Sequence, residues 1–363
     1  MERRSLQRIL AIIAAVGLLV VGCGDPDEDD DGGAADGGTN GGAAADFQAC
    51  QVTDTGGVDD RSFNQTAYDG VVRAADELGV QESVLESQSE ADFESNIQTF
   101  IDQGCDMIVT VGFLLGPATQ AAAEANPDQQ FAIVDFDFFD QDSGDDITLD
   151  NVRELTFATD EAAFLAGYLA AGMTQTNKVG MYGGLEIPTV TIFMDGFQAG
   201  VDYYNQQKGT SVEAVGRNLF TGSFEDQTTG RATTEQLLDE GADIIMPVAG
   251  PVGLGSIEAI RARGNTARLI WVDTDGCISV EAACDLFLSS VEKKMDNAVF
   301  DTVQSAVNGE FEGGLYSGTL ENDGVGIAPF HEFEGQVDPA LAAEIEDLQA
   351  QIIAGEIETS PGG

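Results

Sequence analysis

The chain has 363 residues, 43% of them hydrophobic, and carries 64 acidic residues against 15 basic ones, for a formal net charge of −49. This length and apolar content indicate a folded body, typically split into two domains. The negative field repels phosphate backbones and anionic lipid headgroups, which excludes nucleic acid as an expected partner. Such an acid excess is also typical of proteins in high salt, where screening weakens self-repulsion.

Residues 1–22 have the layout of an export signal. Arginines precede an apolar run, 9–21, whose 13 residues are too few for a bilayer-spanning helix, which needs about 20. The run ends at Cys23 as in a lipobox, which predicts lipidation of Cys23 and anchorage on the extracytoplasmic face of the cell membrane. An ordinary secretory signal with an incidental cysteine is the alternative, and export by the Sec or the twin-arginine route stays open.

Residues 23–46 are rich in Gly, Ala and Asp and show no apolar periodicity. Because such a segment buries too little apolar surface to fold, it is predicted to be a flexible, self-repelling tether. The membrane is therefore expected to contact the protein through the lipid anchor only.

Four cysteines remain besides Cys23, an even number that fits two disulfides in an exported chain. Cys277 and Cys284 are close enough in sequence to close a short loop. Cys50 and Cys105 open the first and third predicted strands, so they would meet at one sheet end if those strands are parallel neighbours. No metal site and no cofactor are expected, since the chain has one histidine and no CxxC motif.

Strands and amphipathic helices alternate from residue 50 onward. The apolar strands CQVTD, SVLES, DMIVTVG and FAIVDFD are separated by segments with helical periodicity. The pattern repeats later, because DQGCDMI (102–108) resembles DEGADII (239–245) and FAIVDFD (131–137) resembles LIWVDTD (269–275). The spacing from Gly104 to Asp135 in the first half differs by one residue from the spacing of Gly241 to Asp273 in the second half. This match indicates two similar α/β lobes with parallel sheets.

The predicted fold class is α/β, with two Rossmann-like lobes joined by a hinge of several crossings. The segment LFLSS and a helix from about 292 to 307 are assigned to the first lobe. Ligands of open parallel sheets lie at the carboxyl ends of the strands, so the cleft between the lobes is the expected site. The expected ranges are 47–155 plus 276–310 for the N-terminal lobe, 156–275 plus 311–345 for the C-terminal lobe, and 346–363 for a C-terminal tail.

The run DTGGVDDRSFNQ follows the first strand and enters a helix. Ser62 and Gln65 fit a capping box, which leaves Phe63 and Asn64 on the cleft wall near Asp54. An aromatic face beside an amide and a carboxylate suits a flat heterocycle with polar edges. The alternative is that Phe63 packs into the core and Asn64 only caps the helix.

The second lobe offers aromatic and glycine counterparts. Phe224, in TGSFEDQTTG, is the candidate to stack on the other face of a planar ligand. It is preferred to Phe193 and Phe197, whose i, i+4 spacing more often indicates a core stripe. Gly250, in GPVGLG, lies in a turn whose bare backbone lets a ligand approach.

Charged candidates follow the later strands. Asp273 ends VDTD, and its repeat mate Asp135 holds the equivalent place; a carboxylate there can accept hydrogen bonds from vicinal sugar hydroxyls. A solvated acid or a helix cap is the simpler alternative for each taken singly. Lys293 lies at a predicted helix start, where the dipole favours anions, so it is a candidate ligand contact, with Lys294 as the alternative.

Five motifs in this order resemble the basic membrane protein family of ABC-transporter substrate-binding lipoproteins: DTGGVDDRSFNQTAYDG, NVRELTFATDEAAFLAGYLAA, GSFEDQTTGRA, EGADIIMPVAG and SSVEKKMDNAV. The resemblance covers about 50 to 330. It implies a type I periplasmic-binding-protein fold whose lobes close on a nucleoside, with a purine nucleoside favoured, and deliver it to ABC permease and ATPase subunits. An exported nucleoside-processing enzyme and a sensor that signals to a membrane receptor are the alternatives.

The resemblance also implies roles for residues. The base lies between rings matching Phe63 and Phe224, and residues matching Asp54 and Asn64 bind its edge. The chain departs from the family after VDTD, where Gly276 replaces a common glutamine. The ribose side matches Asp273 and Lys293, with Gly250 nearby and Asp135 as a further base contact; Ser62 completes the expected ligand-binding set.

Overall fold

The computed structural model describes residues 44–139 and 147–360, which belong to one compact unit. The export signal, Cys23, most of the tether and the end of the tail lie outside the described residues. Within the described ranges, no helix has both the length and the apolarity needed to cross a membrane.

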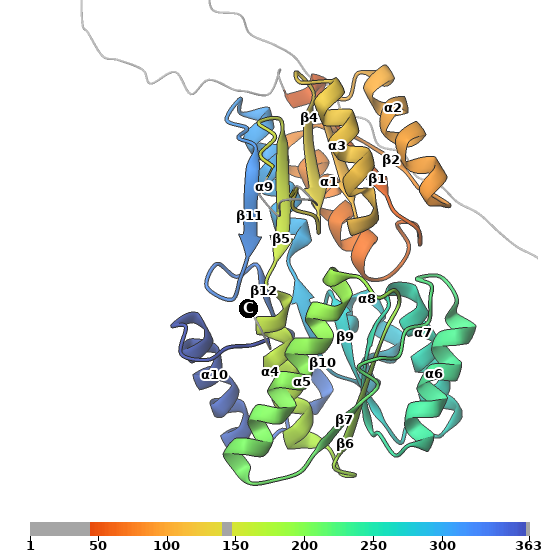
Figure 1. Ribbon diagram of the computed structural model, residues 1–363, viewed down its shortest axis with the longest axis vertical. Coiled ribbons are helices and arrows are strands. Elements are labelled where there is room, and N and C mark those ends of the chain that lie inside the picture. Colours follow the sequence, from red (N-terminus) through yellow and green to blue (C-terminus); the bar gives the residue numbers. More distant parts are fainter. Residues whose placement is uncertain (1–43, 140–146, 361–363) are drawn as a thin grey trace, which may run out of the picture. The chain divides into compact units, whose positions relative to one another are not determined.

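The first lobe is built on a six-stranded sheet in which every pair is parallel (Figure 1). The strand order is β11-β5-β4-β3-β1-β2. Helices α1 and α9 pack on one face, and α2 and α3 on the other. The strands are β1 (Gln48–Thr53), β2 (Gln81–Leu85), β3 (Met107–Val111), β4 (Gln130–Val134), β5 (Val152–Phe157) and β11 (Gly314–Gly318), and the helices are α1 (Phe63–Leu78), α2 (Phe93–Gln103), α3 (Gly116–Ala125) and α9 (Met295–Val307).

The second lobe repeats this plan with the order β12-β10-β9-β8-β6-β7, in which only the β10–β12 pair is antiparallel. Helices α4 and α5 pack on one face, and α6 and α7 on the other. The strands are β6 (Lys178–Gly183), β7 (Glu213–Val215), β8 (Ile244–Val248), β9 (Arg268–Asp273), β10 (Phe287–Lys293) and β12 (Val325–Ile327), and the helices are α4 (Thr159–Met173), α5 (Pro188–Lys208), α6 (Gln227–Asp239), α7 (Leu254–Ala262), α8 (Gly276–Ser279) and α10 (Pro339–Ile353).

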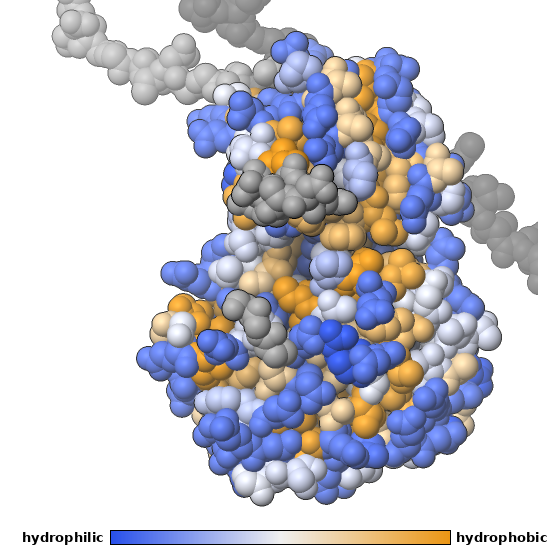
Figure 2. All heavy atoms as spheres, viewed as in Figure 1, coloured by the Kyte–Doolittle hydropathy of each residue, from blue (hydrophilic) through white to orange (hydrophobic). Residues whose placement is uncertain are grey.

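Both sheets are buried on their two faces, as parallel sheets require. Along β3, Met107 and Val109 contact the core shared with α1 and α9, while Ile108 faces α2 and α3. Along β8, Ile245 belongs to the core on the side of α6 and α7, and Met246 to the core on the side of α4 and α5. This period-two division explains why the strands appear in the sequence as unbroken apolar runs. On the face in view in Figure 2, hydrophilic residues cover much of the surface, as the acid excess requires.

The predicted α/β class, the two lobes and the internal repeat are confirmed. Strands β3 and β4 hold the same places in the first sheet as β8 and β9 in the second. These are the two pairs of segments that resemble each other in sequence. The described chain passes between the lobes after β5, β10 and β11, so three segments form the hinge.

The assignment of LFLSS to the first lobe is wrong. This segment is β10, which pairs with β9 in the second sheet, and β11 belongs to the first sheet, not the second. Strand β10 lies inside its sheet and β11 lies at the edge of its sheet. The apolar residues of each strand suit either sheet, so the sequence does not predict which sheet they join. The helix α9 that follows β10 does pack on the first lobe, against α1. It begins at Met295, three residues later than expected.

The structure contains both expected disulfides. Cys50 on β1 is joined to Cys105 just before β3, with their Cα atoms 6.1 Å apart. Strands β1 and β3 are parallel neighbours, which is the condition on which this pairing was predicted. Cys277 and Cys284 close a short loop between β9 and β10.

Candidate functional site

A pocket lies between the two lobes, where strands of both sheets end. The empty space in it and at its open mouth is about 540 Å³. Eight of the nine expected ligand-binding residues line it, and the ninth, Ser62, lies directly behind the wall. The eight are Asp54, Phe63, Asn64, Asp135, Phe224, Gly250, Asp273 and Lys293.

Asp54 and Asn64 form one end of the pocket. Asp54 follows β1, and its Oδ1 accepts a hydrogen bond from Asn64 Nδ2 at 3.1 Å. Asn64 is 2% exposed, and its Oδ1 has no hydrogen-bond partner among the described residues. Gly112, at the end of β3, makes room for the pair, because a Cβ there would lie 2.3 Å from Asp54 Oδ2. Gly112, which also has a positive φ of 119°, is not marked by any motif in the sequence.

The start of α1 is held by Asp60, and the capping box expected from Ser62 and Gln65 is wrong. Asp60 Oδ1 accepts from the backbone N–H of Ser62 and of Gln65, each at 3.0 Å, and its Oδ2 accepts from that of Asn64 at 2.8 Å. Neither Ser62 nor Gln65 makes a side-chain capping bond. Asp60 was missed because DDRS offers two adjacent acids and the Ser-x-x-Gln spacing favours the serine.

Ser62 instead links the two lobes. Its hydroxyl, fully buried, lies 2.6 Å from Asp273 Oδ2 and 3.2 Å from the Val272 carbonyl oxygen, both on β9. Nearby, the Trp271 indole N–H donates to the Arg61 carbonyl oxygen at 3.3 Å. These contacts hold the start of α1 against the end of β9 and so join the two lobes beside the pocket.

Lys293 is the last residue of β10, so its expected place at a helix start is wrong. Its ammonium group forms a buried ion pair with Asp135 of the other lobe. It also lies 4.9 Å from the ring centroid of Phe63 and 5.5 Å from those of Phe157 and Phe193, within the range of cation–π attraction.

Lys294, the alternative to Lys293, does not line the pocket. Its side chain is 35% exposed and pairs with Glu292 at 2.6 Å, outside the cleft. Of the two lysines, the structure therefore brings Lys293 to the other expected residues.

Asp135 and Asp273 occupy equivalent positions, as the internal repeat predicted. One follows β4 and the other ends β9, and both have positive φ, 67° and 71°. This conformation is uncommon for residues other than glycine and is concentrated at functional sites. Burial raises the pKa of both carboxyl groups, while the nearby Lys293 ammonium lowers it. The two strand ends therefore gather buried carboxylates around one cation.

The carboxyl groups of the first lobe are also strongly affected. Burial, together with the charges of nearby carboxylates and against the hydrogen bond from Asn64, raises the pKa of Asp54 to about 8. Burial raises the pKa of Asp60 to about 6, against the three backbone hydrogen bonds that stabilise its anion. Asp54 therefore holds its proton over much of the neutral range in the ligand-free protein.

Aromatic side chains line the pocket from both lobes. Phe63 is the first residue of α1, and Phe224 lies in the loop before α6. Gly184, which follows β6, makes room for the Phe224 ring, because a Cβ at Gly184 would lie 2.3 Å from that ring. Phe193 on α5 also lines the pocket, although its spacing had favoured a purely core role, whereas Phe197 stays in the core. The other lining residues that the sequence does not predict are apolar or uncharged, and no motif marks them.

The chain matches the model of the family described as ABC transporter substrate-binding protein PnrA-like over residues 47–360. It is 33% identical to basic membrane protein A of Borreliella burgdorferi over 306 residues, which cover 83% of this chain and 84% of the relative. It is 32% identical to the ABC transporter nucleoside-binding protein BmpA of Lactococcus lactis subsp. cremoris over 299 residues, 78% of this chain and 81% of the relative.

A solved structure agrees with these matches. The crystal structure of an ABC transporter system solute-binding protein from Aeropyrum pernix K1 superposes with a TM-score of 0.78 at 30% identity. The superposition covers 87% of this chain and 94% of that one. It therefore includes most of both lobes.

Proposed function

Because the chain belongs to the PnrA-like (Bmp) family of ABC transporter substrate-binding proteins, we propose that its pocket captures a nucleoside, with a purine nucleoside favoured. The observation that carries the proposal is the arrangement of one pocket with aromatic rings from both lobes, a buried amide and carboxylate at one end, and buried charges at the other. Each part suits a different part of a nucleoside.

The rings of Phe63 and Phe224 suit the two faces of a base. They come from different lobes, so a planar ligand in contact with both would hold the lobes together. Stacking of a base on an aromatic side chain contributes about 1–3 kcal/mol. This binding free energy would favour the closed arrangement over the open one.

Asn64 and Asp54 suit the polar edge of the base. Since Asn64 Nδ2 already donates to Asp54, the free Oδ1 is left to accept a hydrogen bond from a ligand N–H. An unpaired buried acceptor costs free energy until such a donor arrives. A ligand without an N–H at this position is therefore disfavoured.

Asp273 and Lys293 suit the sugar hydroxyls. Asp273 is positioned by Ser62, and Lys293 by its ion pair with Asp135. A buried carboxylate accepts and an ammonium donates, so adjacent hydroxyl groups can satisfy both. A free base, which lacks the sugar, would leave these two charges without ligand partners.

The same proposal includes delivery to ABC permease and ATPase subunits and anchorage through lipidated Cys23 on the extracytoplasmic face. It treats the protein as a carrier, not an enzyme: bound nucleoside is released unchanged. Incubation with inosine or adenosine, followed by chromatography, tests this point, and appearance of free base would support the alternative of a nucleoside-processing enzyme.

The direct test is identification of the ligand. Mass spectrometry of small molecules released on denaturation, followed by calorimetry of the stripped and refolded protein against nucleosides, free bases, sugars and amino acids, should show one nucleoside bound per chain. A purine nucleoside should bind more tightly than its free base. Exclusive binding of a sugar or an amino acid would overturn the proposal.

Replacement of an aromatic residue tests the pocket. Phe63→Ala should weaken nucleoside binding by about tenfold or more, because one stacking surface is lost. Phe139→Ala is the matched control, since Phe139 is 41% exposed and lies outside the pocket. Equal affinity of the Phe63→Ala variant and the wild type in calorimetry would contradict the proposed position of the base.

A further inference from the structure

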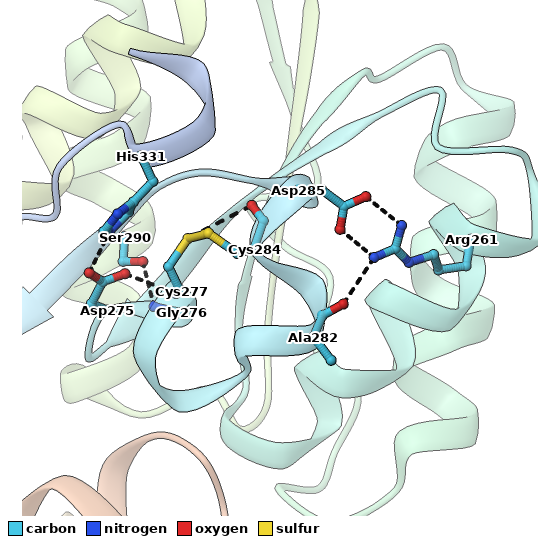
Figure 3. Close-up of a disulfide and its surroundings, with 9 residues drawn as sticks. All are labelled: Arg261, Asp275, Gly276, Cys277, Ala282, Cys284, Asp285, Ser290 and His331. Atoms are coloured by element: carbon cyan, nitrogen blue, oxygen red, sulfur yellow. Dashed lines mark hydrogen bonds and ion pairs between the residues drawn. A yellow bond between two sulfur atoms is a disulfide. The ribbon is translucent and has the colours of Figure 1, made fainter.

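A second cluster of side chains that can bind a metal lies around the Cys277–Cys284 disulfide, in the loop that follows β9 (Figure 3). Donor atoms of Asp275, Cys277 and His331 all lie within 4.8 Å of one another. Cys284 adds a second sulfur, because it is bonded to Cys277. The chain's only histidine, which the sequence left isolated near the C-terminus, thus lies beside a pair of cysteines.

Asp275 fixes the geometry of this cluster. Its Oδ1 accepts from the backbone N–H of Cys277 at 2.9 Å, and its Oδ2 lies 2.6 Å from Nε2 of His331. The side chain is 6% exposed, so its position is set by packing as well as by these bonds. The adjacent Gly276 N–H donates to the Ser290 hydroxyl at 3.0 Å, which ties the loop to β10.

His331 is brought to the cluster by a separate segment. It begins a short 3₁₀ turn, His331–Phe333, after β12, with a positive φ of 44° that few residues other than glycine adopt. Its side chain is 30% exposed, and Cys277 and Cys284 are partly exposed. An ion and a small reductant can therefore reach the cluster from solvent.

We propose that Cys277 and Cys284, once reduced, form with Asp275 and His331 a four-ligand zinc site. Two thiolates, one imidazole nitrogen and one carboxylate oxygen match the ligands that Zn²⁺ takes in tetrahedral sites. Tetrahedral ligands at zinc bond lengths are about 3.5 Å apart. The donor atoms of Asp275, Cys277 and His331 already lie within 4.8 Å of one another. To reach that spacing, the two sulfurs have to separate after reduction, and Asp275 Oδ2 has to move away from His331 Nε2, which is now 2.6 Å from it. The site is separate from the nucleoside pocket and goes beyond the proposed function.

The disulfide and the metal are alternatives at this pair of cysteines. A dithiol reductant supplies two electrons and two protons, giving two cysteine thiols and the disulfide of the reductant. Zn²⁺ then displaces both thiol protons, which pass to solvent. The Nε2–H of His331 faces the Asp275 carboxylate in the metal-free protein, so this nitrogen binds zinc as the ring proton moves to Nδ1 by exchange with solvent. In the oxidised chain neither sulfur is a thiolate, so the four-ligand site exists only after reduction.

Cobalt is the probe of choice, because tetrahedral thiolate-bound Co²⁺ has intense visible bands that carboxylate-bound Co²⁺ lacks. The protein is treated with a phosphine reductant, which is oxidised to its phosphine oxide as the disulfide is cleaved, and titrated with Co²⁺ in excess Mg²⁺ to occupy surface acids. We expect one Co²⁺ per chain with thiolate bands, displaced by one Zn²⁺. The oxidised protein should show no such bands.

Two variants test the ligands. His331→Ala should weaken Co²⁺ binding by about tenfold or more, while its exposed neighbour Glu332→Ala should bind as the wild type does. Cys277→Ser/Cys284→Ser should lose the thiolate bands; if it does not fold, reduced wild type alkylated with iodoacetamide replaces it. The other disulfide does not supply the signal, since Cys50 and Cys105 are at most 3% exposed and have no histidine nearby.

Three results would overturn the proposal. The reduced wild type binds no Co²⁺ with thiolate bands; the oxidised protein gives the same bands; or His331→Ala binds with unchanged affinity and spectrum. The last result would mean that the metal uses the sulfurs without the histidine.

Discussion

Asp54 combines a buried carboxyl group with a position on the pocket wall. Burial raises the pKa of this group to about 8, so the folded protein keeps a proton that the unfolded chain, with a pKa of 3.8, has lost. Between these two values unfolding releases a proton, and a rise in pH therefore favours unfolding. Above pH 8 both states are ionised, and this contribution to the pH dependence ends.

We predict that the ligand-free protein loses stability as the pH rises from 5 to 8. The slope for one such group is up to about 1.4 kcal/mol per pH unit. Asp60, whose pKa burial raises to about 6, adds to the loss at the lower end of the window. Urea denaturation at several pH values measures the free energy of unfolding directly.

Asp54→Asn is the matched variant, since its Oδ1 still accepts the hydrogen bond from Asn64 but its side chain does not titrate. Its free energy of unfolding should depend less on pH than that of the wild type between pH 6 and 8. The same slope in both proteins would show that Asp54 is not the buried acid responsible.

At the scale of single residues, the sequence predicts which side chains line the pocket but not which residues they contact. Asp54, Asp135 and Asp273 were expected in the cleft because each follows an apolar strand, and the structure places all three there. The partners of Ser62 were not predictable, because Asp273 lies 211 positions further along the chain. Gly112 was missed for the same reason: its need to be glycine comes from Asp54 on another strand.

The start of α1 is the element on which both the pocket and the lobe contacts depend. It presents Phe63 and Asn64 to the pocket and Ser62 to β9. Asp60 accepts hydrogen bonds from the backbone N–H groups of Ser62 and Asn64, on either side of Phe63, and so holds this turn. A carboxylate with three backbone N–H donors also satisfies the helix dipole. The cap is therefore a structural part of the site.

We predict that Asp60→Ala lowers the free energy of unfolding by about 1–2 kcal/mol, the cost of losing a helix cap. Gln65→Ala is the control, because its side chain makes no capping bond, and it should be nearly neutral. Chemical denaturation of the two variants checks this. A larger loss in Gln65→Ala than in Asp60→Ala would support the capping box that the sequence suggests.

Elements late in the chain were harder to predict than those near its start. The first four strands alternate regularly with helices, and each pairs with a strand close to it in sequence. Strand β11 pairs with β5, and β10 pairs with β12, across lobe crossings, where the hydrophobic pattern is the same for either sheet. That ambiguity also placed Lys293 on a helix, although it ends a strand.

At the scale of the whole molecule, the two sheets have the same strand order, and their strand ends meet at the pocket. Ser62 with Asp273, Asp135 with Lys293, and Arg61 with Trp271 join the lobes. Ligand contacts with both lobes would add to these few bonds, which is how a binding protein couples ligand capture to closure.

Trp271 provides a reporter of that closure, because it is the only tryptophan in the chain and its indole N–H donates to the first lobe. Opening of the lobes would break this bond and change the surroundings of the ring. We predict that nucleoside titration changes the tryptophan fluorescence, saturating at one ligand per chain with the dissociation constant found by calorimetry. Trp271→Phe should abolish the signal.

Ser62→Ala separates closure from stacking. It removes the hydroxyl that contacts Asp273 but leaves Phe63 and Phe224 in place, so nucleoside should still bind, more weakly, and still change the fluorescence. Phe63→Ala, by contrast, should weaken binding through the base itself. If saturating nucleoside binds in calorimetry while the Trp271 emission stays constant, the contact between Trp271 and Arg61 does not depend on the ligand, and closure does not involve this edge of the lobes.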